Sequence, residues 1–68
     1  MDIKKDIGDK LKKARKKKKL RQSDLARLAG INANYYAKIE RGEVNSSTEI
    51  LQKIIEALKI KSSEILSF

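Results

Sequence analysis

The chain has 68 residues, contains no Cys, His or Pro, and carries a formal net charge of +8. This length allows one small domain over residues 1–68, and the missing Cys and His exclude the commonest metal ligands and nucleophile–base pairs. No apolar run approaches the roughly 18 residues of a membrane span, and no signal-peptide pattern opens the chain. We therefore expect a soluble, cytoplasmic, all-α domain that is not an enzyme and needs no cofactor.

The positive charge is concentrated in one short stretch. Nine Lys and Arg residues and no acid lie between positions 10 and 21, whereas the other 56 residues carry eight bases and nine acids. Such a basic stripe is typical of proteins that bind a polyanion. A solvated helix face that aids solubility shows the same pattern, so the charge alone does not decide the function.

Apolar residues recur at helical spacing at the start of the chain. Ile3, Ile7, Leu11 and Ala14 form one stripe, which predicts a helix over residues 2–19. Gly8 lies inside this helix and should weaken it by up to about 1 kcal/mol relative to Ala.

A second, short helix is predicted over residues 22–29, with Leu25 and Leu28 on its apolar face. Gly30 follows it, and glycine readily adopts the positive φ that a chain reversal needs. Ile31 comes next and is expected to be buried in the angle between this helix and the following one.

A third helix is predicted over residues 33–41, with Asn32 as its N-cap and Gly42 as its C-terminal stop. Tyr36 and Ile39 are its expected inward residues. Two short helices joined by a glycine-containing turn form a helix-turn-helix unit, here at about residues 22–41. The second helix of such a unit can enter a DNA major groove.

Two further helices are predicted after this unit. The sequence Ser46-Ser47-Thr48-Glu49 fits the S-x-x-E capping box, which marks a helix start. An apolar face continues this helix to about residue 58, formed by Leu51, Ile54, Ile55 and Leu58. A last short helix is predicted at about residues 62–66, with Ile65 facing inward.

Three segments of the chain resemble the phage-repressor (Cro/repressor, XRE) helix-turn-helix family. They are QSDLARLAGI at residues 22–31, YYAKIERG at residues 35–42 and LQKIIEAL at residues 51–58. The short chain is similar to small stand-alone repressors and restriction–modification controller proteins. The resemblance implies a compact five-helix, lambda-repressor-like domain that binds operator DNA as a homodimer.

The resemblance also implies which residues contact DNA. Base contacts are expected from Asn32, Ala33, Asn34, Ala37 and Lys38, since Asn pairs with adenine, Lys reaches guanine and Ala packs on thymine methyl groups. Contacts to the DNA backbone are expected from Arg21, Gln22, Ser23, Tyr35, Asn45 and Ser46.

Three other features follow from the same resemblance. Arg15 and Glu40 match a family ion pair that links the first helix to the end of the third. Leu66 and Phe68 are candidates for a dimer contact. Lys59 replaces the glycine that usually follows the fourth helix, so we expect the turn there to be made by other means.

Together these features predict a sequence-specific DNA-binding transcriptional regulator. Its recognition helix, at about residues 33–41, would lie in the major groove of an inverted-repeat operator. The alternative is an antitoxin or adaptor module that binds a partner protein through the same fold. A protein-binding face would more often show a connected apolar patch, and none is visible on the outward positions of the third helix. Neither a membrane nor a small-molecule effector is expected as a partner.

Overall fold

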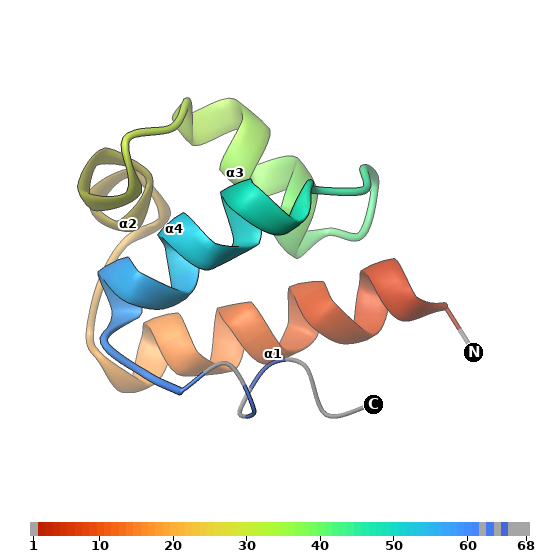
Figure 1. Ribbon diagram of the computed structural model, residues 1–68. Helices are drawn as coiled ribbons and strands as arrows, with labels where there is room; N and C mark the ends of the chain where they lie inside the picture. The colour runs from red at the N-terminus through yellow and green to blue at the C-terminus, as the bar shows by residue number, and fades with distance from the viewer. Residues whose placement is uncertain (1, 62, 64, 66–68) are drawn as a thin grey trace.

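The computed structural model describes residues 2–61, 63 and 65, and this part of the chain forms four α-helices without any strand (Figure 1). They are α1 (Ile3–Lys17), α2 (Gln22–Ala29), α3 (Ala33–Glu40) and α4 (Thr48–Leu58). The all-α class is therefore confirmed. The predicted five-helix count is not confirmed, since the helix expected at about residues 62–66 falls largely outside the described residues.

The four helices enclose one hydrophobic core. Helix α2 packs against α4 and α3, and α1 packs against α3, so α3 is held from two sides (Figure 1). The core is formed by residues from all four helices and by one residue after α4: Leu11, Leu25, Ala26, Ala29, Tyr36, Ile39, Leu51, Ile54, Ile55, Leu58 and Ile65. The predicted inward positions of Tyr36, Ile39 and Ile65 are thus confirmed.

Gly8 lies where α1 crosses the end of α3. A Cβ atom at this position would come within 2.6 Å of the Ile39 carbonyl oxygen and even closer to that of Glu40. Real Cβ atoms do not approach backbone oxygens so closely, so only glycine permits this helix crossing. The residue that weakens α1 as an isolated helix is therefore the one that lets α1 dock on α3.

Two apolar residues that the sequence places on buried faces are exposed instead. Leu28 is 61% exposed and Ile3 is 56% exposed. The buried stripe of α2 is formed by Leu25, Ala26 and Ala29. Because an α-helix turns by about 100° per residue, Leu28 lies well outside that arc, although it is only one turn from Leu25. The prediction for Leu28 was therefore wrong, because the small Ala residues face α3 and α4 instead.

The helix ends differ from the predicted ones in small ways. Helix α4 has Ser47 as its N-cap, and the Ser47 Oγ atom accepts a hydrogen bond from the Ile50 backbone N–H at 3.1 Å. The predicted capping box of Ser46 and Glu49 is therefore wrong, since Ser47 is the N-cap and Ile50, not Glu49, lies three residues after it. Lys59 makes the turn after α4 itself, with φ 57° and ψ 45°. None of the helices in the described part of the chain is long and apolar enough to span a membrane.

Candidate nucleic-acid interface

The turn between α2 and α3 is closed by backbone and side-chain hydrogen bonds. Gly30 has φ 72° and ψ 33°, and the Ile31 N–H donates to the Ala26 carbonyl oxygen at 2.9 Å. The Asn32 Oδ1 atom then accepts from the backbone N–H groups of Asn34 and Tyr35, at 2.8 and 3.1 Å. These bonds confirm the predicted glycine reversal and the predicted N-cap, and they fix the direction in which α3 leaves the turn.

Helix α3 divides into a buried face and an exposed face. Tyr36, Ile39 and Glu40 are buried. The predicted base-contact residues of this helix lie on the other side, where Ala33, Asn34 and Lys38 are exposed and Ala37 is half-buried. Residues 34 and 38 are one turn apart, so their side chains are neighbours on that face. Asn32 precedes the helix, and its Oδ1 atom is engaged in the cap, so its amide NH₂ group is the part of the side chain that the cap does not use.

The start of α2 presents the residues predicted to contact the DNA backbone. Arg21 and Ser23 are exposed. The Asp24 Oδ2 atom accepts hydrogen bonds from the Arg21 backbone N–H at 3.0 Å and from Arg21 Nε at 3.1 Å, and this pairing lowers the pKa of Asp24. The carboxylate thus caps the first turn of α2, since Arg21 has no side-chain acceptor with which to do so. In the free protein the guanidinium of Arg21 is paired with this acid.

Glu40, at the end of α3, connects three parts of the chain. Its carboxylate accepts two hydrogen bonds from Arg15, from Nε at 2.6 Å and from Nη2 at 3.2 Å, and a third from Gln22 Nε2 at 3.0 Å. Arg15 also donates to the Leu20 carbonyl oxygen at 2.7 Å. The structure therefore places together the two residues of the predicted ion pair. The Gln22 bond was missed by sequence reasoning, because no local pattern relates residues 18 positions apart.

Arg15 and Glu40 are deeply buried, with side chains that are 10% and 2% exposed. Burial alone would raise the pKa of Glu40, but the interactions of its carboxylate, foremost the hydrogen bond from Arg15, outweigh it and hold that pKa below its ordinary value. The hydrogen bond to Glu40 raises the pKa of Arg15. Both groups are thus charged at neutral pH, and their bonds tie α1 and the start of α2 to the end of α3.

Tyr36 lies beside this network and differs from Tyr35. Tyr36 is fully buried, and its hydroxyl oxygen makes no hydrogen bond with any atom of the described residues. Burial raises the pKa of the Tyr36 hydroxyl far above its ordinary value. Tyr35 is half-buried and packs against the core with part of its ring. Tyr36 therefore serves packing, whereas Tyr35 keeps contact with solvent on the side where a DNA backbone contact is expected.

The loop after α3 holds the remaining predicted backbone contacts. Asn45 is exposed and Ser46 is half-buried, and both line a small cavity of about 40 Å³ next to Ile3 and Val44. Gly42 precedes them with φ 74°, and Glu43 forms an ion pair with Arg41. The predicted dimer residues, Leu66 and Phe68, lie outside the described residues. No group of three or more acidic or other metal-ligating side chains gathers in the described part of the chain.

A family model described as helix-turn-helix matches residues 11–65. Among curated proteins, the chain is 43% identical to the control protein C.MunI of a Mycoplasma species over 67 residues, which cover 97% of the chain and 90% of that protein. It is also 38% identical to the immunity repressor protein of Bacillus phage phi105 over 60 residues. That match covers 88% of the chain but only 42% of the phage protein.

Two solved structures share the fold over nearly all of the chain. The restriction-modification controller protein C.AhdI from Aeromonas hydrophila superposes with a TM-score of 0.90 and 33% identity, covering 93% of this chain and 96% of that one. The clp gene regulator ClgR from Corynebacterium glutamicum superposes with a TM-score of 0.92 and 25% identity, covering 96% of this chain and 69% of that one.

Proposed function

The chain belongs to the helix-turn-helix family of sequence-specific DNA-binding transcriptional regulators, and we propose that α3 reads an inverted-repeat operator in the major groove. The observation that carries this proposal is the division of α3 into two faces. Its inner face is anchored by Tyr36, Ile39 and Glu40, and its exposed face carries Asn34 and Lys38. Asn and Lys are side chains that read adenine and guanine edges.

The same face argues against the alternative of a protein-binding adaptor. A docking face for another protein generally carries a connected patch of large apolar side chains. The exposed positions of α3 hold only small or polar residues, namely Ala33, Asn34 and Lys38. This composition suits close approach to base edges and offers little apolar area for a protein partner.

Contacts to phosphate groups would fix the angle at which α3 enters the groove. The N-terminus of α2 attracts a phosphate through its backbone N–H groups, and Arg21 and Ser23 are exposed beside it. Gln22 donates one amide hydrogen to Glu40. Its second amide hydrogen would then be directed to a phosphate, so that the Arg15–Glu40 network would hold Gln22 in place for this contact.

The regulated genes are suggested by the relatives that match over nearly their full length. The chain spans 90% of the control protein C.MunI and 96% of the controller C.AhdI, but less than half of the phage immunity repressor. The 43% identity to the first controller and the 33% identity to the second favour the control of restriction–modification genes. Such a controller would act as a homodimer that places two copies of α3 roughly 34 Å apart.

The proposal is tested by comparing the same substitution, Asn to Ala, at two positions of the chain. Asn34→Ala should weaken binding to the selected operator by about 1–3 kcal/mol and change the base preference at one or two positions, because Asn34 is assigned to a base. Asn45→Ala is the matched control and should weaken operator and random DNA alike, because Asn45 is assigned to the backbone. Fluorescence anisotropy with labelled duplexes measures both effects. If Asn34→Ala weakened both DNAs equally, α3 would not be the reading helix in the proposed orientation.

A further inference from the structure

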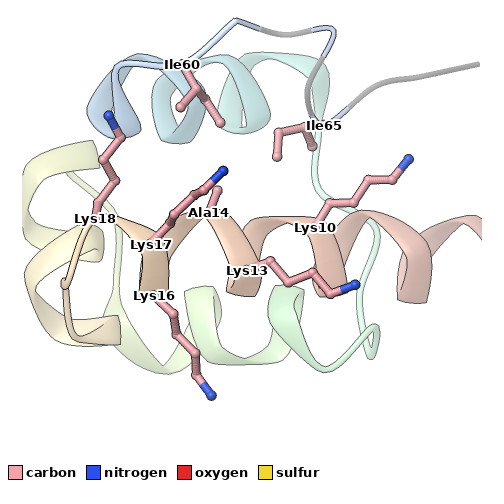
Figure 2. Close-up of a pocket in the computed structure, with 8 residues that line it drawn as sticks. All are labelled: Lys10, Lys13, Ala14, Lys16, Lys17, Lys18, Ile60 and Ile65. Carbon is pink, nitrogen blue, oxygen red and sulfur yellow. The ribbon is translucent and has the colours of Figure 1, made fainter.

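A groove runs between the second half of α1 and the segment that follows α4 (Figure 2). Its volume is about 680 Å³, which lies in the range of pockets that hold ligands or side chains of a partner. The floor is apolar and is formed by Ala14 and Ile60, which are half-buried, and by Ile65, which belongs to the core. Ala14 comes from α1, whereas the two Ile residues come from the chain after α4, so the groove exists only in the folded protein.

The rim of this groove is strongly basic. Every other residue that lines it within the described part of the chain is a lysine: Lys10, Lys13, Lys16, Lys17 and Lys18. Figure 2 shows Lys10, Lys17 and Lys18 extending on the side of Ile60 and Ile65, whereas Lys13 and Lys16 project from the other side of α1. Lysine side chains can cover apolar surface with their methylene groups and keep the ammonium group in water. The groove therefore combines an apolar floor with a positive edge.

This groove is separate from the proposed DNA-reading surface. None of its described lining residues belongs to α2, α3 or the loop that holds Asn45 and Ser46. A DNA backbone could pair with the lysines but has no apolar group that would cover the exposed part of Ile60. The basic stretch at residues 10–21 thus contains a feature that binding to phosphates does not explain.

We propose that this groove docks an acidic amphipathic helix of a partner protein. The charges are complementary, and an apolar side chain of the partner would cover Ala14 and Ile60, which are half-buried. Lys10, whose Nζ atom forms an ion pair with Asp6 at 3.1 Å in the free chain, lies seven residues before Lys17 on α1, which corresponds to two turns and about 10 Å. Acidic residues at positions i, i+3 or i+4 and i+7 of a partner helix would match that spacing, with the apolar residue between them.

A second copy of this chain is a poor occupant of the groove. Two copies that met at this face would bring their lysine rims together, and like charges placed against each other at an interface are unfavourable. An acidic partner would instead place opposite charges against the lysine rim, which is favourable. Because α3 does not line the groove, the protein would be able to bind the partner and an operator at the same time. The groove proposal therefore does not depend on the proposal that α3 reads DNA.

Peptide selection on the whole folded chain tests this proposal. A phage-displayed library of helical peptides is selected on the wild-type protein and depleted on the variant K17E/K18E, which reverses two rim charges at exposed positions. The variant K12E/K53E is the matched control, because it loses the same charge at exposed positions that do not line the groove. The milder variant K17Q/K18Q keeps the test valid if the reversed charges at the end of α1 impair folding.

We expect the retained peptides to carry Asp or Glu on both sides of Leu, Ile or Phe at helical spacing. A labelled peptide of this type should bind K12E/K53E about as well as wild type, K17E/K18E at least tenfold more weakly, and K17Q/K18Q at an intermediate level. The proposal is overturned if no peptide is enriched, if enriched peptides lack either the acidic or the apolar residues, or if both reversed variants lose binding equally. Saturable binding of laurate, abolished in K17E/K18E, together with no enriched peptide, would assign the groove to a fatty-acid anion instead.

Discussion

Lys59 and Lys19 hold backbone conformations that glycine adopts at lower cost. Their φ angles are 57° and 58°, in the left-handed region. An L-residue with a Cβ atom pays about 1 kcal/mol or more in this region. At Lys59 this conformation ends α4 and turns the chain toward Ile60 and Ile65. A lysine therefore occupies a position where glycine is usual, and its backbone is strained there.

Lys59→Gly should therefore raise the free energy of unfolding by about 1 kcal/mol, because glycine removes that strain. Urea denaturation followed by far-UV circular dichroism measures the change. Lys53→Gly is the control, since it places glycine at an exposed position inside α4 and should lower the free energy of unfolding by about 1 kcal/mol. A loss of stability in Lys59→Gly similar to that of the control would contradict the assigned conformation.

Glu40 links the stability of the fold to pH. Its pKa in the folded protein lies below its ordinary value, because the interactions of the carboxylate, foremost the hydrogen bond from Arg15, outweigh burial. The folded state therefore binds the proton less readily than the unfolded state does. The resulting stabilisation is present above the unfolded pKa of about 4.3 and is lost as the pH falls through the folded pKa.

Wild-type protein should accordingly lose stability between neutral pH and pH 3, and Glu40→Gln should show a smaller pH dependence over that range. At pH 7 the substitution should lower the free energy of unfolding by about 3–5 kcal/mol, because it leaves the buried charge of Arg15 without its partner. Urea denaturation at several pH values follows both effects. An unchanged pH profile in Glu40→Gln would show that other carboxylates account for the acid sensitivity.

Sequence reasoning could place Arg15 and Glu40 in one ion pair, because both positions match a family pattern. It could not find the third member, Gln22, whose amide was assigned to a phosphate alone. Hydrogen bonds between side chains that are far apart in the chain depend on how helices are oriented, and no local spacing encodes that orientation.

At the scale of whole helices, the packing of α1 on α3 depends on one small residue. Gly8 brings the α1 backbone against the Ile39 and Glu40 carbonyl groups, so the end of α3 is supported directly by α1. This contact lies next to the Arg15–Glu40 pair, which joins the same two helices. The position of the proposed reading helix is thus set by both a steric fit and an ion pair.

Gly8→Ala should lower the free energy of unfolding by about 1–3 kcal/mol, even though alanine is the better helix former. The added methyl group would push α1 away from rigid backbone atoms that cannot rotate aside. Asp9→Ala is the control at the neighbouring exposed position and should change stability by less than about 0.5 kcal/mol. Thermal denaturation compares the two variants, and a stabilised Gly8→Ala protein would disprove the close crossing.

The helices themselves were largely predictable because each has a strong apolar period and clear end signals. Residues 22–29 were predicted with the correct bounds, since Gly30 and Asn32 mark the two sides of the turn. The face of α2 was predicted less well, because its small Ala residues, not Leu28, meet the core. The helical period of apolar residues identifies the apolar side of a helix. It does not show which of two adjacent rows of side chains on that side packs against another helix.

Over the whole molecule, we propose that the basic charge serves two different surfaces. The start of α2 and the exposed face of α3 provide the proposed operator contacts, and the lysine-rimmed groove lies between α1 and the segment after α4. The total charge predicted a polyanion partner, but only the fold separates these two surfaces. The groove could not be foreseen from sequence, because Ile60 and Ile65 meet Ala14 only after the chain has folded.

Selection from a random DNA library at about 150 mM salt tests the central claim most directly. At this ionic strength, exposed charges are screened beyond roughly 8 Å, so attraction by the lysines alone contributes little to the selection. We predict an enriched inverted repeat whose half-sites are centred about one helical turn of DNA, roughly 34 Å, apart. Enrichment of no sequence, with weak binding that disappears as salt rises, would contradict operator recognition by α3.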